Sequence, residues 1–368
     1  MSASGVEYLF VTSGALVSLE GRGVTARVAS ARLGSILPTR ALTSLGYDAR
    51  TCSTASGIDT AGALVRGAKR VVFGELFSTA EGFGSTIEQY RALLRLVPDP
   101  GERVVFSIAD DHFAESSVRD FYRAALPDCL AVVTVSEALA RTIAPMTQRP
   151  ILVAPEPYEG LRGAPQVFTA RAPRGPVGWL ARRVGLSQDL WRLRLLWFGY
   201  AMNLPPLIDM LPAIEVLARR HPLSLTIVTL PFAELAQIVT PQRGDESSAL
   251  RVHFQEWQPH IMDAAFAAHD LVLIPSAYRD PVKRAKSPNR LVAGIHAGRL
   301  VIAHPLPAYE PYSAYAWIGE DLCAGIEWSI RYPQEALERI RRGQAFIDQR
   351  HSPEVVARFW LDVFHPRN

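Results

Sequence analysis

Short apolar runs alternate with longer amphipathic segments along most of the chain. The runs that read as strands in the first half are 8–12, 48–51, 70–74, 103–109, 131–135 and 151–154. Those of the second half are 194–198, 224–230, 250–254, 270–275 and 301–303. Between them lie segments with apolar residues near the helical period, including 36–45, 86–96, 205–219, 333–349 and 352–364. Strands that alternate with helices predict βαβ units and parallel sheets.

A stretch rich in proline and glycine separates two similar halves. Residues 161–190 contain Gly163, Pro165, Pro173, Gly175 and Pro176, which indicates a linker. The pattern therefore predicts an α/β protein with two Rossmann-like, doubly wound domains, at 1–165 and 191–351, joined by a linker at 166–190. In such sheets ligands bind outside the carboxyl ends of the strands, so we expect a cleft lined by these ends.

The composition indicates the general class of protein but not its activity. The 368 residues are 48% hydrophobic and 20% charged, which is ordinary for a globular protein with sizeable cores. A net charge of +3 is too mild to indicate nucleic-acid binding. No apolar run is long enough to span a bilayer, and the three separated cysteines show no metal spacing, which fits a reducing cytoplasmic setting.

The stretch 283–305 carries the strongest candidate site. A basic loop with Lys283, Arg284 and Lys286 leads into Ser287, Pro288, Asn289 and Arg290, where proline predicts a helix start. Gly298 closes the predicted helix before a short strand. Free backbone N–H groups beside cations suit a phosphate group. The alternative is a solvated basic loop without a ligand.

This stretch resembles the nucleotide-sugar site of GT-B glycosyltransferases, in particular those of family four. In that family a Lys/Ser–Pro–Asn–Lys/Arg run opens a helix that a glycine closes. The resemblance implies that Lys283, Lys286, Ser287, Asn289 and Arg290 contact the donor, and that the C-terminal helix, 352–368, packs back on the first domain. One position departs from the family: Ala293 stands where a glutamate usually binds the donor ribose.

Three further positions of the second half are donor-side candidates. Gly199 ends a predicted strand and would allow a phosphate or sugar to approach the backbone, although a plain tight turn explains it equally well. Tyr200 and Asn203 follow it where similar enzymes carry phosphate-binding cations. Trp257 lies in a region that, by the resemblance, is next to the nucleotide base, and the alternative is a core tryptophan.

The first half offers the acceptor-side candidates. Asp111 and His112 follow a predicted strand, and a histidine oriented by a carboxylate can position or deprotonate a hydroxyl near neutral pH. The alternative is an aspartate that caps the next helix. Arg27 and Arg32 lie in the region that similar enzymes use for the acceptor. Glu75, alone at a strand end, reads as an ordinary loop residue.

Together these residues predict a glycosyltransferase that moves a sugar from a nucleotide-diphosphate donor to a glycan, lipid-linked or small-molecule hydroxyl, as in polysaccharide biosynthesis. The resemblance implies a metal-independent, retaining reaction without a cofactor. It also fits a cytoplasmic protein that binds peripherally to the inner membrane surface and binds no nucleic acid. Two alternatives remain, a catalytically silent GT-B homologue acting as a scaffold and a nucleotide-sugar epimerase. A Rossmann oxidoreductase is disfavoured, because neither half has a G-x-G-x-x-G run.

Overall fold

The computed structural model describes residues 6–19, 23–79, 82–168, 192–231, 249–258 and 260–366. It contains two compact units. The first comprises 1–159, 284–288 and 349–368, and the second comprises 160–283 and 289–348. The chain therefore passes between units after Glu159, Lys283, Pro288 and Asp348. Most of the expected linker at 166–190 lies outside the described residues.

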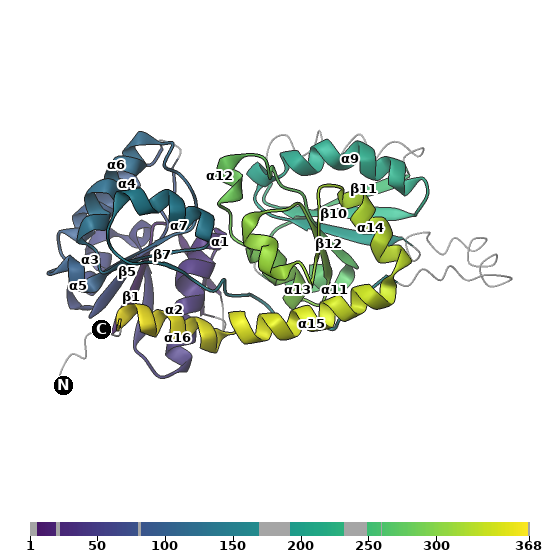
Figure 1. Ribbon diagram of the computed structural model, residues 1–368. Helices are drawn as coiled ribbons and strands as arrows, with labels where there is room; N and C mark the ends of the chain where they lie inside the picture. Colours follow the sequence, from purple (N-terminus) through teal and green to yellow (C-terminus); the bar gives the residue numbers. More distant parts are fainter. Residues whose placement is uncertain are drawn as a thin grey trace. The chain divides into compact units, whose positions relative to one another are not determined.

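The first unit contains a six-stranded parallel sheet in the order β4-β1-β5-β6-β7-β8. Three of its strands, β1, β5 and β7, are labelled in Figure 1. Its strands are β1 (Tyr8–Thr12), β4 (Ala49–Ser53), β5 (Arg70–Phe73), β6 (Val104–Ile108), β7 (Ala131–Thr134) and β8 (Ile151–Val153). Its helices are α1 (Ala29–Ala31), α2 (Leu37–Ser44), α3 (Ile58–Gly67), α4 (Gly84–Leu94), α5 (Pro100–Arg103), α6 (Ser116–Ala125), α7 (Glu137–Ile143) and α16 (Pro353–Phe364). A separate antiparallel hairpin, β2 (Leu16–Leu19) with β3 (Gly23–Ala26), follows β1.

Alternate side chains of each strand enter different cores. In β1, Leu9 and Val11 pack with α3, α4, α6 and α7, whereas Tyr8 and Phe10 face α2 and α16. The ring of Phe364 in α16 stacks on Tyr8, with centroids 4.5 Å apart and planes 8° apart. The C-terminal helix thus completes one face of the first unit's sheet, because its aromatic side chains cover strand positions that would otherwise meet water.

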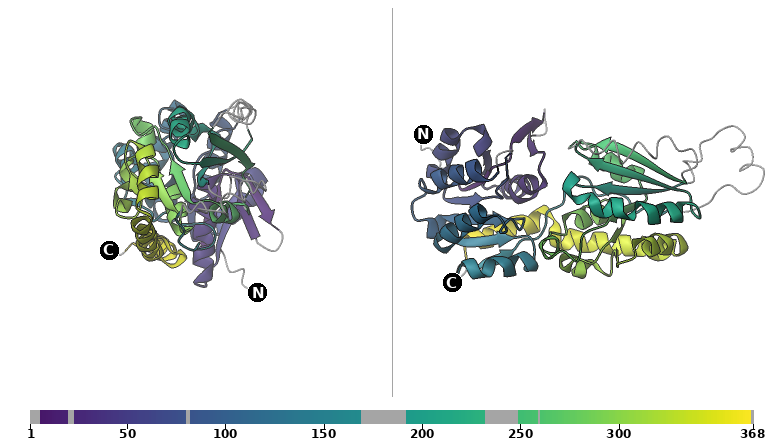
Figure 2. Two further views of the ribbon diagram at one scale, coloured as in Figure 1. Left: turned by 90° about the vertical axis from the view of Figure 1, so that its right-hand side faces the viewer. Right: turned by 90° about the horizontal axis from the view of Figure 1, so that it is seen from above.

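The second unit contains another six-stranded parallel sheet, in the order β11-β10-β9-β12-β13-β14. Its strands are β9 (Leu193–Phe198), β10 (Leu223–Thr229), β11 (Leu250–Glu256), β12 (Leu271–Ile274), β13 (Leu300–Ala303) and β14 (Trp317–Ile318). Its helices are α9 (Pro205–Ala218), α11 (Met262–Ala268), α12 (Pro281–Arg284), α13 (Asn289–His296), α14 (Leu322–Arg331) and α15 (Pro333–His351), of which α12 and α15 end just beyond its limits. Helices α9, α14 and α15 pack on one face, and α11 and α13 contact strands of the sheet as well (Figures 1 and 2).

The predicted α/β fold with two parallel sheets is confirmed. Local chemistry explains where several helices begin and end. Ser136 and Ser352 accept backbone N–H bonds at the starts of α7 and α16, as capping residues do. Gly298 follows α13 at φ 73°, and a Cβ there would lie 2.5 Å from the carbonyl oxygen of Ala164, so only glycine fits. The hairpin β2–β3 and helix α14 were not expected from the sequence.

Candidate active site

Ionisable side chains gather at the carboxyl edge of the first unit's sheet. Glu75 follows β5, Asp110 and His112 follow β6, and Glu156 follows β8. Strands β5 and β6 are neighbours, so the residues just after them meet at one edge although more than thirty positions separate them in sequence. The edge of the parallel sheet brings these four groups together.

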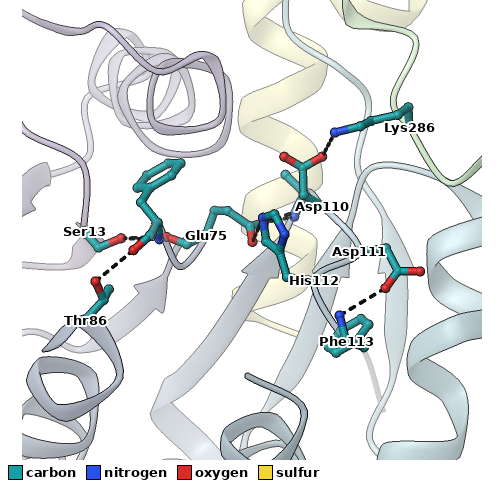
Figure 3. Close-up of polar contacts among 10 residues, drawn as sticks. Ser13, Glu75, Thr86, Asp110, Asp111, His112, Phe113 and Lys286 are labelled. Carbon is teal, nitrogen blue, oxygen red and sulfur yellow. Dashed lines mark hydrogen bonds and ion pairs between the residues drawn. The ribbon is translucent and has the colours of Figure 1, made fainter. Parts of the chain in front are cut away.

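Glu75 is almost fully buried and reaches the loop after β6 (Figure 3). Its Oε2 accepts the backbone N–H groups of Ala109 and Asp110, the second at 3.0 Å. Its Oε1 lies 3.9 Å from Nε2 of His112. Burial, helped by the negative charge of Asp110, raises the pKa of the Glu75 carboxyl to about 8, against the opposing effect of the two N–H bonds and of Lys286.

The two predicted catalytic residues have different surroundings. The ring of His112 packs against Phe83, with centroids 5.1 Å apart, and about a third of its side chain is exposed. The Asp111 carboxylate instead accepts the backbone N–H of Phe113 at 3.2 Å, which closes a local turn. It does not cap the next helix, because α6 begins at Ser116 after Glu115 and has no side-chain cap. The carboxylate next to the imidazole is therefore Glu75, not Asp111 (Figure 3). The catalytic roles of His112 and Asp111 stay predictions.

Lys286 belongs to the first unit, in the short segment 284–288. Its ammonium pairs with the Asp110 carboxylate (Figure 3). Two other contacts hold the segment: Ala285 is buried in the first unit's core, and the Ser136 hydroxyl donates to the Ala285 carbonyl at 2.7 Å. The expected donor contact of Lys286 would therefore compete with an ion pair already formed.

Glu156 provides a second buried carboxyl at this edge. It is only 4% exposed. Burial and the charge of Asp110 raise its pKa to about 8. From the sequence, Glu75 was expected to be an ordinary loop residue, and Glu156 was not among the candidates. Their one sequence signal is a glutamate shortly after an apolar strand, which many loops share.

Arg290 lies in the first turn of α13 in the second unit. Burial lowers the pKa of its guanidinium, and Tyr309 beside it opposes that effect. Its buried Nη1 has no hydrogen-bond partner among the described residues, and no carboxylate there pairs with the guanidinium. A desolvated cation without a counter-charge is costly, so this geometry favours an anion.

Gly199 follows β9 and lies next to this guanidinium. A Cβ at Gly199 would lie 3.4 Å from Nη1 of Arg290 and 3.3 Å from the ring of Trp197. The space beside the Gly199 backbone, which glycine keeps open, is therefore occupied by the side chains of Trp197 and Arg290. Two other buried polar atoms near the carboxyl ends of β9 and β10 also lack partners in the described part of the chain: Nε1 of Trp197 and Oγ1 of Thr229. Native structures leave few such groups unsatisfied, which again points to a polar ligand at this edge.

The remaining donor-side candidates lie around the same sheet. Tyr200 is 59% exposed, and Asn203 ends the short turn Ala201–Asn203 before α9. Trp257 follows β11, is half-buried and donates its backbone N–H to Thr229 at 2.8 Å. Lys283 lies in α12, and Asn289 opens α13, where its Oδ1 accepts the Arg290 N–H. Ser287 belongs to the first unit with Lys286. Donor contacts of these residues stay predictions.

The two predicted acceptor-side arginines follow the β2–β3 hairpin. Arg27 is exposed. Arg32 is buried, forms a 2.8 Å ion pair with Glu159 and donates from Nη1 to the carbonyls of Ala26 and Arg27. These contacts give Arg32 a structural role in holding the chain after the hairpin. An acceptor contact of either arginine stays a prediction.

The described residues contain neither a metal-binding cluster nor a helix that could span a membrane. No group of three or more His, Cys, Asp or Glu side chains in the described ranges is arranged to hold a metal ion. Among the same residues, none of the helices has the length and apolarity needed to cross a membrane.

Comparison with known proteins identifies the fold. No family model matches the sequence, and no curated protein matches it. Solved structures do match over nearly the full length. HepE of Anabaena in complex with UDP and glucose has a TM-score of 0.62 at 13% identity, covering 98% of this chain and 100% of that one. The OtsA apo structure gives 0.64 at 10%, again over 98% and 100%. A glycosyltransferase of Rickettsia africae gives 0.58 at 11% and 97% of each chain.

These neighbours are GT-B glycosyltransferases, so the predicted GT-B fold is confirmed. At 10–13% identity the likeness establishes the fold and leaves the activity to be argued from the site.

Proposed function

We propose that this protein is a glycosyltransferase that moves a sugar, a hexose or deoxyhexose, from a nucleotide-diphosphate donor to a hydroxyl of a glycan, lipid-linked or small-molecule acceptor. Three kinds of observation support the proposal: the GT-B fold, neighbours solved with UDP or UDP-glucose, and the basic stretch that opens α13. The observation that carries it is the guanidinium of Arg290, whose Nη1 is buried and which has no carboxylate partner among the described residues.

The chemistry needs such a cation. When a glycosyl bond to a diphosphate breaks, negative charge grows on the leaving phosphate oxygens, and a fixed guanidinium in a desolvated site stabilises that charge. The first N–H groups of α13 lie next to Arg290 in sequence and provide further donors. We propose that charge stabilisation comes from these groups without a metal ion or other cofactor, that the anomeric configuration is retained, and that the protein works in the cytoplasm or peripherally at the membrane.

Acceptor chemistry belongs to the other carboxyl edge. His112, with a partly exposed ring, would position the acceptor hydroxyl. Glu75 lies next to it in the same unit and accepts the backbone N–H of Asp110. Arg27 is the exposed candidate for acceptor contact, since Arg32 is neutralised by Glu159.

The test uses Arg290→Met, a change that removes the charge and keeps most of the length. Binding of UDP, dTDP, GDP and ADP would be measured by calorimetry and by thermal shift. We expect one diphosphate to bind the wild type and to lose about 10- to 100-fold in affinity in the variant, as for a lost charge-assisted hydrogen bond. The exposed Arg219→Met is the matched control and should bind as the wild type does.

Stability separates a binding role from a structural one. Arg290 contacts Tyr309 but has no counter-charge among the described residues. Removing the desolvated charge relieves its cost, so the ligand-free Arg290→Met protein should melt at or above the wild-type temperature. A lower melting temperature with unchanged nucleotide affinity would contradict the proposal.

A second candidate is a GT-B homologue that binds a nucleotide without turnover. Ala293 favours it, because α13 has no carboxylate there to hold a ribose. In this case a diphosphate would still bind at Arg290, but no sugar would be released from any nucleotide sugar.

A further inference from the structure

The geometry of the first unit points to a residue that works through His112. We propose that Glu75 is a positioning residue: its carboxyl and the His112 imidazole hold one proton between them and so fix the ring state that meets the acceptor hydroxyl. The inference rests on the proposed function for the role of His112. The contact itself lies entirely within the first unit.

The two oxygens of Glu75 have separate tasks. Oε2 is engaged by the backbone N–H groups of Ala109 and Asp110, which ties the end of β5 to the loop after β6. Oε1 is then directed to Nε2 of His112, 3.9 Å away (Figure 3). The other end of the Glu75 residue is fixed too, because the Ser13 hydroxyl donates to its carbonyl at 3.0 Å. The carboxyl is therefore held in place by protein contacts on both sides.

A purely structural role would not require an acid here. A glutamine would offer the same kind of oxygen to the two N–H groups, without the cost of burying an ionisable group. An acid adds the ability to exchange a proton with the neighbouring imidazole. Either the carboxyl is protonated beside a neutral ring, or a carboxylate faces an imidazolium, and both arrangements of the pair are neutral overall. Such a pair suits burial better than an isolated charge does.

The surrounding groups set how this proton responds to pH. Asp110 raises the pKa of Glu75 through its negative charge, and Lys286 lowers it. The buried hydroxyls of Tyr90 and Tyr122 also lie within range of the Glu75 charge. His112 lies next to Glu75, and its ring also packs against Phe83.

The decisive experiment follows the His112 ring by NMR and needs no substrate. The nine histidines would be labelled in the ring, and His112 assigned from the spectrum of His112→Gln. In the wild type we expect the His112 signals to show a titration step near pH 8 that reports Glu75. In Glu75→Gln that step disappears, while the exposed Glu137→Gln control keeps it.

Substitutions of two charged neighbours of Glu75 test the direction in which the titration step moves. Asp110→Asn removes a negative charge and should move the step to lower pH, whereas Lys286→Met removes a positive charge and should move it to higher pH. A His112 titration that is the same in the wild type and in Glu75→Gln would overturn the proposal, whatever the protein's activity.

A second experiment compares the rates at which the wild type and Glu75→Gln release UDP from UDP-glucose. Glu75→Gln should lower kcat by about 10²-fold, as for loss of an acid–base group, flatten the pH profile and leave UDP affinity unchanged. If UDP and UDP-glucose do not bind the wild type, that result counts against the UDP donor, and the NMR step alone decides the Glu75–His112 pair. A Glu75→Gln enzyme with wild-type kcat and pH profile contradicts the positioning role.

Discussion

The buried carboxyl of Glu156 makes the stability of the first unit depend on pH. Its pKa is raised from 4.5 to about 8 in the folded protein, first by burial and then by Asp110. A raised carboxyl pKa means that the folded state holds a proton that the unfolded chain has released. The stabilisation is complete below pH 4.5 and is lost as pH rises toward 8.

The magnitude follows from the size of that shift. Each pH unit between the two values costs about 1.4 kcal/mol, so at pH 7.5 the wild type loses up to about 4 kcal/mol relative to its own stability at low pH. Glu156→Gln keeps the shape and cannot ionise. We therefore expect it to exceed the wild type by less than about 1 kcal/mol at pH 5 and by up to about 4 kcal/mol at pH 7.5.

Hydrogen exchange of peptides from β7 and β8 would report opening of this unit at both pH values. His351, whose Nδ1 lies 2.8 Å from the Glu156 carbonyl and whose pKa burial lowers to about 4, contributes equally to both proteins. Glu102→Gln, an exposed change in the same unit, is the control. A gain that is equal at pH 5 and pH 7.5, or a loss at pH 7.5, would refute the reasoning.

Three further substitutions test the second unit. Gly199→Ala places a methyl group 3.4 Å from Nη1 of Arg290, and we expect weaker nucleotide binding by calorimetry with about 1 kcal/mol of lost stability. Gly298→Ala puts a Cβ on a backbone with φ 73° and brings it close to the Ala164 carbonyl oxygen. Denaturant unfolding should therefore show a loss of about 1–3 kcal/mol in the stability of this unit. Ala293→Glu restores a carboxylate for ribose hydroxyls and should raise turnover with UDP-glucose over dTDP-glucose; an unchanged ratio counts against that role.

The sequence was sufficient to predict much of the fold, because the strands are apolar runs with short, well-marked ends. The run that became β1 matches its predicted limits, and the restart at β9 marks the second sheet. The hairpin β2–β3 escaped detection because Val17 and Val24 are exposed rather than part of a periodic core pattern. Helix α13 was predicted from Pro288, which precedes it, and from Gly298, which follows it.

Only those site residues that lie together in one short stretch of sequence could be predicted. Arg290 stands in a recognisable local run, so its position at a helix start follows from nearby residues. Glu75 has no such context: its burial and its contact with His112 depend on β5 and β6 being neighbours in the sheet. The ion pair of Lys286 with Asp110 joins positions 176 apart in sequence, and periodicity contains no information about such a contact.

The path of the chain has a practical consequence for anyone who cuts it. A fragment that stops at Glu159 would lack α16, leaving Tyr8 and Phe10 without the aromatic cover of Phe364 and Trp360. It would also lack the segment that buries Ala285. Chimaeras that exchange the first unit between proteins of this fold therefore have to carry three separate pieces of sequence, and a single crossover point should yield insoluble protein.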